Sequence, residues 1–451
     1  AAVFARGYMA SDDHHQVVEI AARWLRGIPM FLDGQEVFYR SLLYPAVHWL
    51  ILRAARAVGV VDPDAAMLTV RLCLGLYSLW GVAIAWKYGQ VLGRRAARRA
   101  GWLGSTEAGN DAGNGVGNEV RNGVGNGVGN EVGNGVGNGV GLLAGALVAA
   151  HAILPYASVR SLVETAALPP LLHGLYLLDR AILGPVAEPG ARRRRAADGL
   201  ISGLLFGLAI LLRTQAVFAA AGAAACLLWS RRFRAGAIWA AGLAAVILLQ
   251  GLADLALYDS FLASPLAYLR FNRAHLHEYV TGPWWRMVLL VPAAFLPPFG
   301  LFFFAAMFRA ARHGGVLTWA TAVFLIAHAA IPQKQERFLL PIFPELALLG
   351  TLGLVLWVRA RRQGAQPSPA RARWYRRGWA VFWGMNLLLL PLGLIHYGQR
   401  ARIEPLLEIY RRGDAGAVVA DLTEEAPGLP FFYLDGGDPG RSVPVHLIRN
   451  P

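Results

Sequence analysis

The chain has 451 residues, of which 56% are hydrophobic and only 16% are charged, against about 25% charged residues in an average soluble domain. Because about 20 apolar residues make one membrane span, this composition favours a polytopic membrane protein over a soluble enzyme, a disordered chain or a fibrous repeat. The formal net charge of +15 raises the question of a nucleic-acid partner. Both cysteines, Cys73 and Cys226, lie in apolar segments, which argues against a disulfide framework or a cysteine metal site.

Ten apolar segments follow one another along the chain and predict an all-α membrane bundle. They cover residues 67–88, 141–156, 162–179, 200–213, 215–229, 235–252, 286–306, 316–332, 338–357 and 378–396. The shortest of these could also be buried or re-entrant helices. We expect about ten spans, or eleven if a further helix precedes Ala1.

Arginine clusters occupy alternate loops between these segments and predict how the chain is oriented. They comprise Arg94, Arg95, Arg98 and Arg99, then Arg192 to Arg195, then Arg231, Arg232 and Arg234, then Arg309 and Arg312, and finally the arginines between residues 359 and 377. The positive-inside rule assigns all five clusters to the cytoplasmic side. They account for most of the excess positive charge, so we expect no nucleic-acid partner. The opposite loops should face the periplasm or a lumen.

Two segments differ in composition from the rest. Residues 104–140 repeat Gly-Asn-Gly-Val and Gly-Asn-Glu-Val units, a composition too poor in large apolar residues to pack a core. We expect a disordered cytoplasmic insert there. Residues 397–451 are less apolar and carry Gly and Pro turns and short strand-like runs. They predict a small extracytoplasmic cap of mixed structure, beside a transmembrane domain at residues 1–396.

A polar run at residues 11–19, SDDHHQVVE, carries the first candidate site. If residues 12–25 are helical, Asp12, Gln16 and Glu19 share one face, and Asp13 points about 100° away. Carboxylates at a membrane surface suit general-base chemistry on a sugar hydroxyl, but the same run could simply begin a helix with acids in its first turn. The two adjacent histidines cannot face one point on a helix, so we expect no metal and no cofactor.

The second candidate site is the segment at residues 332–338, PQKQERF, on the side opposite the arginine clusters. Positive charge there departs from the orientation rule and calls for a local reason. Lys334 and Arg337 could bind the phosphate of a lipid-linked donor. Alternatively, they could extend to the membrane surface beside Glu336.

Further polar and aromatic residues occupy the same predicted side. Arg40 and Ser41, with Tyr44 and Pro45, could bind an anionic headgroup or form an interfacial belt. Charged residues at span ends are candidates for function, and aromatics in the long loop could stack on sugars. These further candidates are Glu164, Arg213, Asp254, Asn272 and Trp284.

In this order, the motifs resemble the membrane mannosyltransferases that use dolichyl-phosphate mannose (glycosyltransferase family twenty-two, GT-C fold), which include the GPI-anchor and N-glycan-precursor enzymes. The first-loop acids and amide match Asp12, Asp13, Gln16 and Glu19, with Ala10 and Ser11 in place of the family's His and Pro. The Arg-Ser-x-Leu-Tyr/His-Pro element matches Arg40, Ser41, Leu43, Tyr44 and Pro45. Looser matches are Ser161, Glu164, Thr165, Asp254, Tyr258 and Asn272. The family's motif near the end of the transmembrane domain matches the segment that begins at residue 332. The matching residues are Lys334, Arg337, Phe338, Pro341 and Pro344, with Gln333 and Gln335 in place of the family's His and Glu.

The resemblance implies an inverting, metal-independent transfer of a sugar, mannose being expected, from a polyprenyl-phosphate donor. The acceptor would be a hydroxyl of a lipid-linked or extracytoplasmic glycan, and membrane lipids would surround the enzyme. Asp12, with Asp13 second, would be the general base, and Lys334, Arg337 and Arg40 would bind the donor phosphate. Substrate-binding positions would be Gln16, Glu19, Tyr44, Glu164, Arg213, Asp254, Asn272 and Trp284. A lipid or sugar transporter and an inactive partner in a glycosylation complex are the alternatives, and glucose or arabinose could replace mannose.

Overall fold

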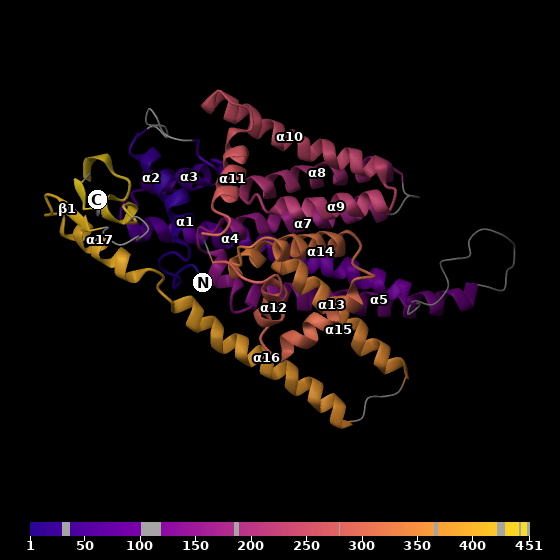
Figure 1. Ribbon diagram of the computed structural model, residues 1–451. Helices are drawn as coiled ribbons and strands as arrows, with labels where there is room; N and C mark the ends of the chain where they lie inside the picture. Colours follow the sequence, from indigo (N-terminus) through magenta and orange to yellow (C-terminus); the bar gives the residue numbers. More distant parts are fainter. Residues whose placement is uncertain are drawn as a thin grey trace.

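The computed structural model describes residues 1–28, 37–100, 119–184, 189–278, 280–364, 369–421, 429–441 and 443–448. The described chain is a bundle of helices with one small two-stranded sheet (Figure 1). The N-terminal part contains α1 (Ser11–Asp13), the π-helical turn η1 (His14–Val18), α2 (Glu19–Leu25) and α3 (Leu43–Ala57). The all-α fold class is confirmed.

Two sets of helices form the body of the bundle. The first set is α4 (Pro63–Arg99), α5 (Glu119–Ala150), α6 (Leu154–Ser158), α7 (Val163–Leu183), α8 (Ala191–Leu212), α9 (Ala216–Trp229), α10 (Phe233–Tyr258) and α11 (Ala263–Ala274). The second set is α12 (Trp285–Ala294), α13 (Phe299–Ala310), α14 (Val316–Ala330), the 3-10 turn η2 (Glu336–Ile342), α15 (Phe343–Gly364) and α16 (Pro369–Ile395).

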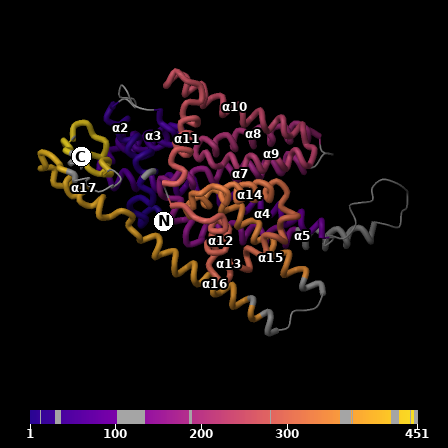
Figure 2. The backbone as a smooth tube through the Cα atoms, viewed as in Figure 1, coloured from indigo at the N-terminus to yellow at the C-terminus, as the bar shows by residue number. Residues whose placement is uncertain are grey.

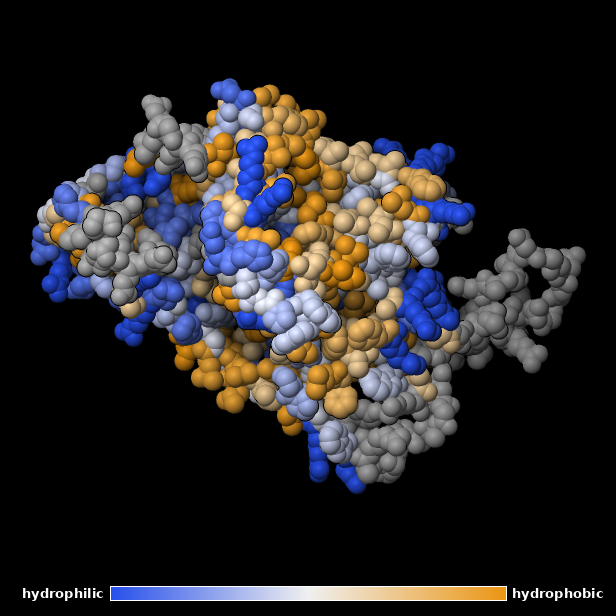
Figure 3. Space-filling model, viewed as in Figure 1, coloured by the Kyte–Doolittle hydropathy of each residue, from blue (hydrophilic) through white to orange (hydrophobic). Residues whose placement is uncertain are grey.

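Helix α7 is the centre of the bundle, since it packs against α4, α8, α9, α14, α15 and η2. Nearly all of its side chains are buried, and the two internal prolines, Pro169 and Pro170, lie in this packed part. On the face seen in Figure 3, hydrophobic side chains predominate over the middle, and hydrophilic ones are concentrated toward the left and right ends. This distribution is the one expected of a protein whose middle lies in lipid.

Each of the ten predicted apolar segments lies largely on helix, but fewer helices are long enough to cross a membrane alone. Five described helices pass on length and composition, and a sixth span results if α12 and α13 are counted together. Those two helices are bent by 111° relative to each other, so the single span predicted at 286–306 is broken. Pro297 and Pro298 occupy the break and cannot donate helical backbone hydrogen bonds. Helices α9 and α14 are apolar but shorter.

The close packing of α4 and α5 depends on glycines at four-residue spacing. A Cβ atom at Gly89 would lie 2.8 Å from the Cα of Gly141, and one at Gly93 would lie 2.9 Å from the Cα of Gly137. Small residues at this spacing let two helix backbones approach closely within a membrane. This corrects part of the expected disordered insert, because its residues 119–140 are helical and the last turns among them pack on α4. Residues 101–118 lie outside the described chain.

The C-terminal segment folds against the N-terminus. It contains α17 (Arg400–Arg412), β1 (Val418–Asp421), α18 (Phe432–Asp435), the 3-10 turn η3 (Pro439–Arg441) and β2 (Val445–Ile448). The two strands pair in parallel, with Val418 opposite Val445. Figure 2 shows α16 leading back to α17 and the C-terminal segment lying beside α2. A second hydrophobic core joins Val17 and Val18 to Leu407 and Phe432, so the predicted cap shares its core with the first helical turns.

The glycine contact predicts a position-specific effect on stability. In Gly141→Ala, the new methyl group would lie 2.6 Å from the carbonyl oxygen of Trp86, so the helices must separate. We expect a loss of about 1–3 kcal/mol, measured as thermal unfolding in detergent. Gly139→Ala is the matched control, because nothing lies within 4 Å of its added Cβ. It should be neutral or stabilising by about 0.5–1 kcal/mol. Equal losses in both variants would contradict this packing.

Candidate functional site

A π-helical turn sets the direction of the residues in the first motif. Within it, the N–H of Glu19 donates to the carbonyl of His14 five residues earlier. Residues five apart therefore share a face, and His14 Nε2 lies 3.2 Å from Glu19 Oε1. Gln16 instead donates from Nε2 to the hydroxyl of Tyr39. The predicted common face of Gln16 and Glu19 is thus wrong, because a π turn changes the helical period at this point.

Glu19 contacts the C-terminal segment. Its carboxylate accepts the N–H of Phe432 at 2.9 Å, at the start of α18. The ring of His14 lies between Tyr8 and Tyr433, with ring centroids 4.4 Å and 5.7 Å away and interplanar angles of 16° and 10°. The first motif is therefore held in place by residues from the C-terminal segment. The contacts of Glu19 stabilise this fold, because its carboxylate binds His14 and the backbone of Phe432.

Asp13, the second acid of the motif, lies between two arginines. Its side chain is 1% exposed. Arg40 Nη1 lies 2.5 Å from Asp13 Oδ1, and Arg337 Nη1 lies 3.6 Å from Asp13 Oδ2. The side chain of Asp12 lies outside the described part of the chain. Ala10 occupies the N-cap position of α1 and makes no side-chain capping hydrogen bond.

Arg337 also reaches a second buried acid. Its Nε lies 3.6 Å from Glu164 Oε1, and Arg213 Nη2 lies 3.1 Å from the same oxygen. Glu164 is fully buried and Arg213 is 5% exposed. The guanidinium of Arg213 also lies over the ring of Phe338, 5.3 Å from its centroid.

We call the five residues Asp13, Arg40, Glu164, Arg213 and Arg337 the arginine–carboxylate cluster. Its three guanidinium groups and two carboxylates carry a formal net charge of +1. Glu164 lies in the first turn of α7, Arg213 between α8 and α9, and Arg337 in the first turn of η2. Asp13 ends α1, and Arg40 lies three residues before α3. The positive end of the α7 dipole favours the carboxylate of Glu164 at this position.

Asp254 belongs to a neighbouring hydrogen-bonded chain. It accepts Gln250 Nε2 at 2.7 Å and both the N–H and the hydroxyl of Ser264 at 2.9 Å. Gln250 in turn accepts the hydroxyl of Ser41 at 3.0 Å. Because Ser41 follows Arg40, this chain ties the segment that carries Arg40 to α10 and α11. Neither Gln250 nor Ser264 was singled out by the sequence, and only their contacts reveal them.

Tyr44, four residues after Arg40, is buried near the start of α3. Its carbonyl contacts His48 Nδ1 at 3.0 Å, and His48 Nε2 lies 3.0 Å from the hydroxyl of Ser161. Among the described residues, the Tyr44 hydroxyl has no hydrogen-bond partner. The Arg-Ser-x-Leu-Tyr motif and the segment before Glu164 are therefore packed together, as their shared predicted side requires.

Lys334 has contacts of a different kind from those of Arg337. Its ammonium donates to the carbonyls of His328 at 3.0 Å and Ala329 at 3.1 Å, and to that of Ile331. These carbonyls end α14, so Lys334 caps this helix. The side chain is 1% exposed, and burial lowers the pKa of the ammonium. The structure therefore places its charge on the end of α14 and not in the arginine–carboxylate cluster.

Two further candidates also lie apart from the cluster. Asn272 donates from Nδ2 to the carbonyl of Tyr268 within α11, and Trp284 is 65% exposed before α12. Near Asn272, the ring of Phe271 stacks on Tyr39 at 4.7 Å. Within the described chain, no group of three or more His, Cys, Asp and Glu side chains is arranged to hold a metal ion.

The buried pair of Glu164 and Arg213 predicts a large loss of stability when one partner is removed. Glu164→Gln leaves the guanidinium of Arg213 without its carboxylate, and breaking such a buried pair costs about 3–5 kcal/mol. Thermal unfolding in detergent measures this change. Glu408→Gln, at an exposed pair with Arg412 at 2.9 Å, is the matched control and should change stability little. An equally small loss in Glu164→Gln would contradict the importance of the pair.

Comparisons with known proteins identify the family and the fold of this chain. The family model of the Alg9-like mannosyltransferase family matches residues 2–400. The structure is similar to ArnT from Cupriavidus metallidurans bound to undecaprenyl phosphate, with a TM-score of 0.62, 13% identity, and 98% of this chain and 86% of that chain covered. The apo form of that protein gives a TM-score of 0.59 and 15% identity over the same shares. A search of curated proteins found no match.

These findings confirm the expected GT-C fold and the resemblance drawn from the motifs. Apolar helices of spanning length and the shared fold make the chain a multi-pass membrane protein. Because the family model covers nearly the whole length, from the first motif through η2 and α15 to α16, the chain belongs to the Alg9-like mannosyltransferase family and is a glycosyltransferase.

Proposed function

We propose that the protein transfers a sugar, mannose in the first instance, from a polyprenyl-phosphate donor to a hydroxyl of a lipid-linked or extracytoplasmic glycan. Membership of the mannosyltransferase family supports the reaction and the sugar. The similar fold of ArnT, a protein solved with undecaprenyl phosphate bound, supports a polyprenyl donor. The observation that carries the proposal is the arginine–carboxylate cluster, whose net positive charge suits a phosphate.

In this reaction, the bond between the sugar C1 and the phosphate oxygen breaks, and polyprenyl phosphate leaves with the electron pair. The acceptor oxygen attacks C1 from the opposite face, which inverts the configuration, and its proton passes to a base. The leaving phosphate is already ionised and requires fixed positive charge rather than an acid. Arg40 and Arg337 supply such charge in a planar form that suits phosphate oxygens.

The two acids of the first motif would have different roles. Asp13 lies 2.5 Å from Arg40 Nη1 and 3.6 Å from Arg337 Nη1. Its position therefore suits an anchor that fixes the two arginines. We assign the general base to Asp12, as the family resemblance implies, and keep Asp13 as the second candidate.

The proposed active site faces the periplasm or lumen. Glu164 and Arg180 lie 16 residues apart on α7, which separates them by about 24 Å along the helix axis. Arg180 lies near the arginine clusters of α4 and α8 that the positive-inside rule assigns to the cytoplasm. The arginine–carboxylate cluster is therefore at the other end of the same helix.

The assay that tests the proposal combines purified protein, polyprenyl-phosphate mannose and a panel of lipid-linked and glycan acceptors. Formation of a glycosylated acceptor together with free polyprenyl phosphate is the expected result. Movement of the intact lipid across a vesicle membrane without any product would favour the transporter alternative. The absence of both would favour an inactive partner of a glycosylation complex.

The division of roles between the two acids predicts different kinetic defects. Asp12→Asn should lower kcat by about 10²–10⁴-fold with little change in donor KM, because only proton transfer is lost. Asp13→Asn should raise donor KM, because Arg40 and Arg337 lose their anchor. Initial rates over a range of donor concentrations, with thermal unfolding as a folding control, separate the two effects. Near-normal turnover in Asp12→Asn would remove it from the role of base.

The contrast between Arg337 and Lys334 gives a second test. Arg337→Lys keeps the charge but loses the planar group, and should raise donor KM roughly tenfold, since a hydrogen bond to a charged group contributes about 1.5–3 kcal/mol. Lys334→Met should chiefly lower thermal stability, because three carbonyls at the end of α14 lose their donor. If Lys334→Met raised donor KM without loss of stability, Lys334 would bind the phosphate as the family motif implies.

A further inference from the structure

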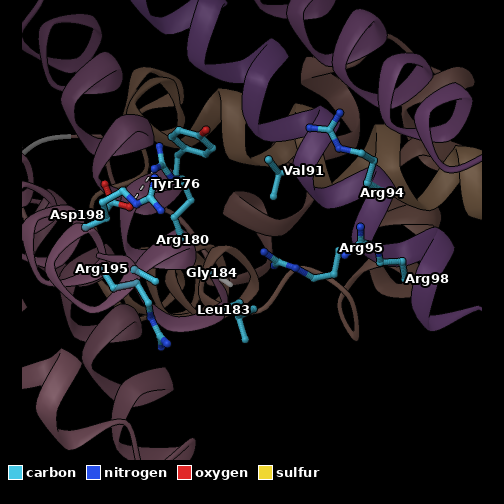
Figure 4. A pocket seen from close by; sticks show the side chains of 12 residues that line it. Val91, Arg94, Arg95, Arg98, Tyr176, Arg180, Leu183, Gly184, Arg195 and Asp198 are labelled. Atoms are coloured by element: carbon cyan, nitrogen blue, oxygen red, sulfur yellow. Dashed lines mark ion pairs between the residues drawn. The ribbon is translucent and has the colours of Figure 1, made fainter. Parts of the chain in front are cut away.

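A second positively charged site lies at the opposite end of α7 from the arginine–carboxylate cluster. It is a pocket of about 470 Å³ between α4, α7 and α8. Six arginines line it: Arg94, Arg95, Arg98, Arg180, Arg194 and Arg195. Figure 4 shows the α4 side chains on one side of the pocket and Arg180, Arg195 and Asp198 on the other.

Acidic residues neutralise only part of this charge. Arg95 Nη2 lies 2.7 Å from Asp179 Oδ2, and Arg180 Nη2 lies 3.2 Å from Asp198 Oδ2. Together, the six arginines and these two acids carry a formal charge of +4. The guanidinium groups that line one pocket repel one another, and an anion bound between them would reduce this repulsion.

The individual arginines differ in how firmly they are held. Arg195 donates to the carbonyls of Ala181 and Ile182 at 2.7 Å and 3.0 Å, so α7 fixes its position. Arg94 and Arg98 make no ion pair or side-chain hydrogen bond with any described residue. The pocket thus combines fixed guanidinium groups with two that have donors available to a ligand.

The place of the pocket indicates which anion it takes. It lies at helix ends in the arginine-rich loops, where basic pockets between membrane helices bind lipid headgroups. The apolar side chains of Val91 and Leu183 also line it, and Leu183 is 41% exposed. A phosphate with an attached glycerol and acyl chain would meet both kinds of surface.

We propose that this pocket binds the phosphate headgroup of an anionic membrane phospholipid. The site is separate from the proposed donor site, since about 24 Å of α7 lies between Glu164 and Arg180. Lipid binding at this pocket therefore does not depend on the proposed reaction. A bound lipid would join the ends of α4, α7 and α8 through a shared anion.

The test is lipid binding to the delipidated full chain in detergent, followed by native mass spectrometry. The probes are phosphatidylglycerol and phosphatidylcholine with the same acyl chains. We expect the protein to prefer phosphatidylglycerol, and Arg94→Gln/Arg98→Gln to weaken that binding roughly tenfold or more, since one arginine near an anionic headgroup contributes a factor of about five. Arg376→Gln/Arg377→Gln is the matched control, because it removes two exposed arginines of the same predicted membrane side outside the pocket. It should change binding less than about twofold.

Three results would overturn the proposal. One is equal weakening in the pocket and control variants, which would mean diffuse attraction to the whole arginine-rich surface. Another is equal binding of phosphatidylcholine. The third is displacement of the lipid by glycerol phosphate at the concentration at which the lipid binds, which would assign the pocket to a soluble phosphate. If the double variant fails to fold, the exposed Arg98→Gln alone should weaken binding about fivefold.

Discussion

The bridge that Arg337 makes between Asp13 and Glu164 is the contact on which the site depends. Both carboxylates are almost fully buried, and an unpaired buried charge is so unfavourable that neither acid could stay ionised there alone. Arg40 and Arg213 each pair with one of these acids, and Arg337, 3.6 Å from both, joins the two pairs. The first helical turn, the start of α7 and the start of η2 therefore meet at this point. This pairing holds the arginines in place without a ligand, and such preorganisation is what the proposed stabilisation of a leaving phosphate requires.

The C-terminal segment extends this constraint to the other end of the chain. Phe432 donates to Glu19, and Tyr433 stacks on His14, so both contacts hold the π turn that follows Asp13. Arg26 and Asp435 add a third link at 2.7 Å. Burial raises the pKa of the Asp435 carboxyl, and its partner Arg26 opposes that shift. The segment thus acts on the orientation of the first motif without contributing to the arginine–carboxylate cluster.

Sequence patterns predicted the helices and the residue types of the site, but not how those residues pair. Apolar segments identify helices because a membrane interior demands them, but they do not show that α12 and α13 are bent by 111° at the break that contains Pro297 and Pro298. Lys334 and Arg337 look equivalent in the sequence, yet one meets the carbonyl end of α14 and the other meets two acids. Pairs such as Arg213 with Glu164 join residues far apart in the chain, so only the folded bundle decides them.

The two ends of α7 show that positive charge serves different purposes in one protein. At Glu164, three arginines meet two acids, so folding itself neutralises most of the charge and holds each guanidinium in place. At Arg180, six arginines meet two acids, and Arg94 and Arg98 have no acidic partner among the described residues. The positive-inside rule accounts for the second group alone. The arginines of the arginine–carboxylate cluster are balanced by buried acids instead, and this balance holds them at the proposed site of the donor phosphate.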